Sequence, residues 1–179
     1  QPYRVALADA YCQSKSWDSL EAYLQDQKWG DYDFVRLAYL TRAAYQQGNT
    51  IVGQESWRAA VRVAAARVGA LSMLARLAGE WKMEAEREEL LWMIVQRHPA
   101  ERWALQALNA VYREAGNSQG LQQIYATQLN FDPDNIIAGN NFASISLLLG
   151  IQLNRAYELA QRAWEKFPNN PAFAMTYAY

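Results

Sequence analysis

Three prolines recur at an almost constant interval, and this spacing constrains the fold more than any other feature. Pro99, Pro133 and Pro168 are 34 and 35 residues apart, and each follows one helical pattern and precedes the next. Between successive prolines lie two amphipathic segments separated by a glycine, Gly116 in one interval and Gly150 in the next. A period near 34 residues with two helices per unit is typical of a solenoid of stacked helix pairs. We therefore predict an all-α repeat protein.

The interval from 102 to 133 shows the pattern most clearly. Apolar residues recur there at steps of three and four, which places them on one face of each helix. Gly116 is expected to end the first helix in the left-handed conformation, and Pro133 ends the second because it lacks an N–H. In the next interval Asn170 and Pro171 start a further helix as N-cap and first helical residue. The two stripes of the clearest interval are Leu105, Leu108, Val111 and Tyr112, then Leu121, Ile124, Tyr125 and Leu129.

These residues resemble the tetratricopeptide repeat (TPR) family, in a degenerate form of the bacterial type. The resemblance covers nearly the whole chain and is strongest from about Val68 onward. It implies a right-handed superhelical solenoid of antiparallel helix pairs, about five pairs plus a truncated last helix. The positions that match its consensus of large apolar, aromatic, small, glycine and proline residues are Leu105, Leu108, Tyr112, Gly116, Tyr125, Ala156, Ala163 and Pro168.

The resemblance implies that residues 1–179 form one solenoid domain. We expect this domain to be a fragment of a longer protein. The third unit departs from the pattern, with Lys82 where glycine and Arg87 where alanine is expected. In the second unit the second helix is expected to begin late, after Thr50 to Glu55. An irregular helical bundle with coincidental spacing is the alternative. The approximate units are 1–31, 32–67, 68–101, 102–135, 136–170 and a partial 171–179.

In the resembling family the first helix of each pair lines a concave groove. Arginines at the matching positions would present guanidinium forks to carboxylates of a peptide, and Tyr45 and Trp103 would supply rigid apolar contacts. Alternatively the arginines are solvated or pair with Glu80 or Glu114. The carboxylate-binding set of two lysines, two asparagines and an arginine known in part of the family is absent. The groove candidates are Arg42, Tyr45, Arg76, Trp103, Gln106, Arg113, Asn140 and Ser144.

Composition excludes several classes of function. The net charge of −1 arises from well-mixed charges, so we expect no nucleic-acid partner. Apolar runs are too short to span a membrane. Cys12 is the single cysteine and His98 the single histidine, in different repeats, so neither a disulfide nor a nucleophilic pair is predicted. The acidic run 84–89 is expected to be a solvated helix face. We predict no catalytic residue, cofactor or metal, and a lone cysteine fits a reducing compartment without excluding the periplasm.

The sequence thus favours a non-catalytic scaffold that binds a protein or peptide, as an extended segment or a helix, in the groove. Self-association through the solenoid ends is one alternative, and a recognition or regulatory arm of a larger enzyme or envelope assembly is another. Among the tryptophans, Trp29, Trp81 and Trp103 lie near predicted loops or helix starts and are expected to be exposed. Trp17, Trp92 and Trp164 fall on apolar stripes and are expected to pack in the core.

Overall fold

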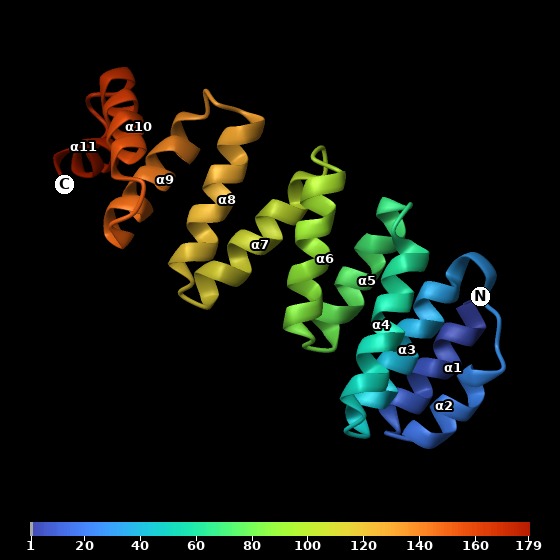
Figure 1. Cartoon of the computed structure of the whole chain (residues 1–179). Helices are drawn as coiled ribbons and strands as arrows, with labels where there is room; N and C mark the ends of the chain where they lie inside the picture. Colours follow the sequence, from blue (N-terminus) through green and yellow to red (C-terminus); the bar gives the residue numbers. More distant parts are fainter. Residues whose placement is uncertain (1) are drawn as a thin grey trace. The chain divides into compact units, whose positions relative to one another are not determined.

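The computed structural model describes residues 2–179, and within that range the chain is α-helical with one short 3-10 helix and no strand (Figure 1). Five helix pairs and a last single helix follow one another, which confirms the predicted TPR-like fold class. No helix among these residues combines the length and apolar character needed to cross a membrane. The elements are α1 Pro2–Gln13, α2 Trp17–Gln25, η1 Gly30–Tyr32, α3 Asp33–Gln46, α4 Thr50–Ala64, α5 Val68–Glu80, α6 Glu84–Arg97, α7 Arg102–Glu114, α8 Ser118–Phe131, α9 Ile136–Leu149, α10 Leu153–Lys166 and α11 Pro171–Ala178.

The chain divides into two compact units, Gln1–His98 and Pro99–Tyr179. Unit 1 contains α1 to α6, and unit 2 contains α7 to α11. In unit 1, α3 packs on α4 and α5 on α6; in unit 2, α7 packs on α8 and α9 on α10. We call α1, α3, α5, α7, α9 and α11 the first helices, since each opens a pair or, for α11, follows the last one. The single solenoid domain over residues 1–179 stays a prediction.

First helices of neighbouring pairs also contact each other inside each unit. α3 contacts α5 in unit 1, and α9 contacts α11 in unit 2. The hydroxyl of Tyr39 on α3 donates a 2.5 Å hydrogen bond to Oδ1 of Asp9 on α1, which ties the first two pairs together. Each unit therefore has a face built from first helices.

The turns inside the pairs use the left-handed backbone conformation that the glycines predict. Gly116 and Gly150 have φ of 63° and 68°. Lys82 has φ of 59° and Lys15 has φ of 54°, so lysine occupies the same kind of turn in two other pairs. The turn of the third unit therefore forms although lysine stands in place of glycine, and Lys82 carries the backbone strain.

Small residues allow the close helix packing that the sequence predicted. Ala143, Ala156 and Ala163 are all 0% exposed, as is Phe142. Ala143 on α9 packs with Ala156 and Ala160 on α10, and Leu159 covers the cluster. The register assigned to these two helices is therefore confirmed.

Several sequence expectations were wrong. Trp17, Trp92 and Trp164, which were expected in the core, are only half-buried. α4 begins at Thr50 rather than after Glu55. Gly53 therefore lies inside this helix, directly on the ring of Tyr45: a Cβ placed there would be 2.3 Å from two ring atoms. Trp29 is 1% exposed rather than accessible, although it lies in a loop. Trp103 is exposed as expected, at 37%.

Candidate functional site

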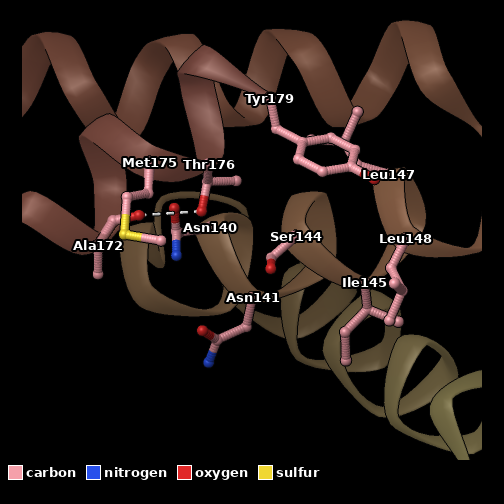
Figure 2. A pocket seen from close by; sticks show the side chains of 10 residues that line it. All are labelled: Asn140, Asn141, Ser144, Ile145, Leu147, Leu148, Ala172, Met175, Thr176 and Tyr179. Carbon is pink, nitrogen blue, oxygen red and sulfur yellow. Dashed lines mark hydrogen bonds between the residues drawn. The ribbon is translucent and has the colours of Figure 1, made fainter.

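A pocket lies between α9 and α11 in unit 2, and we call it the α9–α11 pocket (Figure 2). Its volume is about 480 Å³. Two of the predicted groove residues, Asn140 and Ser144, line it together with eight others. In Figure 2, Asn141 and Ser144 lie near the centre of the view, with Met175 on one side and Leu148 on the other. The full lining is Asn140, Asn141, Ser144, Ile145, Leu147, Leu148, Ala172, Met175, Thr176 and Tyr179.

Helix caps position both walls of this pocket. The side chain of Asn135 accepts a 3.0 Å hydrogen bond from the Ala138 N–H and starts α9. Asn170 does the same for the Ala172 N–H at 3.0 Å, with Pro171 as first helical residue, which confirms the predicted start of α11. Residues three and four apart share a helix face, so Ala172, Met175 and Thr176 point to one side of α11.

The polar groups of the α9–α11 pocket are unequally satisfied. Thr176 Oγ1 donates to the carbonyl oxygen of Ala172 at 3.0 Å, within its own helix. Asn140 is only 6% exposed, and its Oδ1 atom is fully buried. This atom nevertheless has no hydrogen-bond partner among the described residues. Buried side-chain oxygens are almost always hydrogen-bonded in native proteins. The Oδ1 atom of Asn140 is thus a buried acceptor without a donor among the described residues.

Large apolar side chains at the α9–α11 pocket are open to water. Leu148 is 68% exposed, Met175 is 75% exposed and Tyr179 is 79% exposed. Contiguous exposed apolar groups around a hollow are typical of a binding surface, whereas single ones are ordinary.

A second pocket lies on the first-helix face of unit 1, among α1, α3 and α5, and we call it the α1–α3–α5 pocket. Its volume is about 440 Å³. Arg76 lines it, and its guanidinium pairs with Glu80 at 2.6 Å, in agreement with the alternative of an acidic neighbour. Burial, and next the hydrogen bond to Asp9, raise the pKa of Tyr39 well above its usual value. Its lining is Pro2, Val5, Ala6, Asp9, Tyr32, Val35, Tyr39, Met73, Arg76 and Leu77.

The other two candidates of unit 1 are engaged within the unit. The Arg42 guanidinium carbon lies 4.9 Å from the ring centroid of Trp81 and 5.9 Å from that of Trp17, which are cation–π distances. The Tyr45 hydroxyl donates to Oε1 of Glu86 at 2.6 Å. Burial, with a smaller contribution from this bond, raises the pKa of Tyr45 above its usual range. Tyr45 therefore faces the second helices α4 and α6.

The remaining candidates lie on α7, outside both pockets. Trp103 Nε1 donates to Oε2 of Glu101 at 2.8 Å. Gln106 and Arg113 are exposed. Of the residues that the sequence predicted for the groove, Asn140 and Ser144 thus line the α9–α11 pocket, and Arg76 lines the α1–α3–α5 pocket. The sequence missed the contribution of Ala172, Met175 and Thr176, for which the only signal was the helix start at Asn170.

Residues 2–179 contain no group of three or more His, Cys, Asp or Glu side chains placed to hold a metal ion. Cys12 is 6% exposed, and burial raises the pKa of its thiol from 9.0 to about 11. A protonated buried thiol is a poor nucleophile and a poor metal ligand.

Comparisons with known proteins find matches among solved structures only. No family model matches the chain, and no curated protein matches it. Among solved structures, the chain is similar to the crystal structure of MamA, with a TM-score of 0.41 and 16% sequence identity. The matched region covers 89% of this chain and 93% of the MamA chain.

Proposed function

We propose that this chain is a degenerate tetratricopeptide-type module that binds a peptide segment or a helix of a partner protein and performs no catalysis. One observation carries the proposal: in both units an apolar pocket lies on the first-helix face, about 440 Å³ in unit 1 and about 480 Å³ in unit 2. Stacked helix pairs characteristically use such extended faces for binding. Pockets that accept particular side chains of the bound segment would then give the chain its selectivity among partners.

The pocket linings suit protein side chains. Apolar groups dominate both of them, and a few polar groups lie among these, which is the usual anatomy of a recognition site. The buried, protonated state of Cys12 supports the non-catalytic part of the proposal.

Self-association is the second candidate, and a specific observation favours it. Tyr179, Met175 and Leu148 are each at least 68% exposed at one end of unit 2. A second copy of the chain would cover these side chains, just as a partner peptide would. Sedimentation of the chain over a wide concentration range separates the two, because only self-association gives a mass that rises with concentration.

The test is selection of peptides from a random displayed library on the whole chain, followed by titration of the selected peptides. Ala6→Arg and Ser144→Arg each place a long charged side chain at one pocket, from positions that are exposed. Gln123→Arg on α8 adds the same side chain to an exposed position outside both pockets and is the matched control.

We expect at least one pocket variant to lose binding by tenfold or more, with Gln123→Arg unchanged. Equal binding by all three variants would contradict the proposal, since the peptides would then bind elsewhere on the chain. Failure to select any peptide, together with a mass that rises with concentration, would favour self-association instead.

A further inference from the structure

The α1–α3–α5 pocket contains a carboxylate that no basic side chain of the described residues neutralises. Asp9 lines this pocket from α1 and is half-buried. Its Oδ1 atom accepts the 2.5 Å hydrogen bond from Tyr39, and no ion pair joins Asp9 to a basic side chain among residues 2–179. A carboxylate that has lost part of its water is stabilised by a cation at hydrogen-bond distance. Asp9 therefore offers a negative charge to a ligand of the pocket.

The second oxygen of this carboxylate is accessible. Oδ2 accepts no hydrogen bond among the described residues, and it is not one of the fully buried side-chain atoms that lack a partner. It consequently keeps contact with water. The Tyr39 hydroxyl meanwhile holds the carboxylate in one orientation, so less conformational freedom is lost when a ligand pairs with it.

The arginines near the pocket are engaged elsewhere. The Arg76 guanidinium lines the pocket but pairs with Glu80 at 2.6 Å, so these two charges offset each other. Arg42 on α3 does not line the pocket, and its guanidinium carbon lies 4.9 Å from the ring centroid of Trp81. The charge that remains for a ligand inside the pocket is therefore the negative charge of Asp9.

The rest of the lining is mostly apolar and suits the stem of a long basic side chain. Val5 and Val35 come from α1 and α3, and Met73 and Leu77 come from α5. Lysine and arginine lay their methylene stems along apolar surface while the charged group stays beside a polar partner. Tyr32, which is 44% exposed, adds an aromatic ring to the same pocket, and cations are attracted to such rings.

We infer that the α1–α3–α5 pocket binds a lysine or arginine side chain of a partner protein, with its charged group paired to the Asp9 carboxylate and its stem on Val35 and Met73. The inference rests on the proposed function and specifies the partner of one of its two pockets. It departs from the acidic peptide that the arginines of the sequence suggested, because the arginine that lines this pocket already pairs with Glu80.

The test uses two displayed libraries of random decapeptides on the whole chain. Both contain the same apolar residues. One library has Lys and Arg but no Asp or Glu, and the other has Asp and Glu but no Lys or Arg. Peptides from the basic library are expected to be enriched, and their sequences show whether lysine or arginine is selected.

Asp9→Asn and Glu55→Gln form a matched pair for affinity measurements on the selected peptides. Each removes one negative charge from unit 1, but Glu55 is exposed on α4 and lies outside the pocket. The amide oxygen of Asn can still accept the hydrogen bond from Tyr39, so Asp9→Asn should unfold at an unchanged temperature. We expect Asp9→Asn to weaken the basic peptides about tenfold, as the loss of a charge-assisted hydrogen bond does, and Glu55→Gln to leave them unchanged.

A change in the peptide separates direct pairing from an indirect effect of Asp9 on the fold. Replacing the selected basic residue by methionine keeps an unbranched stem and removes the charge. We expect this peptide to bind the unaltered chain about tenfold more weakly and Asp9→Asn with little further loss, because the two changes remove one interaction. The loss on the unaltered chain cannot arise from altered folding.

Three results would overturn the inference. Enrichment of the acidic library, with binding lost in Ala6→Arg, would reject the basic ligand and leave the proposed function standing. Equal effects of Asp9→Asn and Glu55→Gln on the basic peptides would show a general effect of charge and no pairing with Asp9. Enrichment of neither library would reject the inference and the proposed function together.

Discussion

Lys82 occupies a backbone conformation that L-amino acids avoid, with φ of 59° in the turn between α5 and α6. Glycine adopts this conformation without the clash of a Cβ atom. We expect Lys82→Gly to raise the free energy of unfolding by about 1 kcal/mol, measured by urea unfolding as a higher midpoint with unchanged slope. The control Lys166→Gly removes the same charge from the helical end of α10 and should lower stability. Stabilisation by both, or by neither, would contradict the assigned turn.

Cys12 reports on the packing of unit 1. Because burial raises the pKa of its thiol to about 11, the native protein should react slowly with iodoacetamide at pH 8 and rapidly once unfolded. The unfolded thiol ionises near 9.0. Its contribution to stability is therefore complete below pH 9 and is lost as the pH rises toward 11. Rapid labelling of the native chain would show that α1 is not packed as described.

At the scale of the helix pair, glycines permit close contact with an aromatic ring. A Cβ on Gly53 would lie 2.3 Å from the ring of Tyr45, and one on Gly120 would lie 2.6 Å from the ring of Tyr112. We expect Gly53→Ala and Gly120→Ala each to destabilise by about 1–3 kcal/mol through overpacking. Gly69→Ala on α5 meets open space and should stabilise by up to about 1 kcal/mol. Thermal unfolding of the three variants separates the effect of the clash with an aromatic ring from the general effect of replacing glycine by alanine in a helix.

Ala163 tests the packing of α10. It is 0% exposed, so Ala163→Arg would overpack the helix pair and bury an unpaired charge. We expect a loss of several kcal/mol and faster amide hydrogen exchange in α9 and α10. Gln161→Arg, exposed on the same helix, is the control and should change stability little. An unaltered melting temperature for Ala163→Arg would show that the register of α10 is wrong.

The helices and their turns were predictable because their causes are local in sequence. The stripe of Leu105 and Leu108, the glycine at 116 and the cap at Asn170 each act within a few residues. The burial of Trp29 and the early start of α4 were not predictable in this way. Trp29 lies in a loop and is buried all the same, so its burial depends on other elements that pack over it.

At the scale of whole units, contacts between elements that are distant in sequence likewise limited what could be predicted of the candidate site. Repeat register placed Asn140 and Ser144 on one first helix, and both line the α9–α11 pocket. It could not indicate Met175, because the relevance of this residue arises only when α11 folds back beside α9. It also suggested Tyr45, which the structure instead joins to Glu86 on the side of the second helices.

The most direct test of the account is hydrogen exchange of the whole chain with and without a saturating selected peptide. We predict slower exchange in first helices, above all α9 and α11, with α8 and α10 unchanged. That pattern would place the ligand on the first-helix faces of the units, where the two pockets lie. Protection confined to α8 and α10 would contradict the central claim, because the partner would then bind the opposite face of the helix pairs.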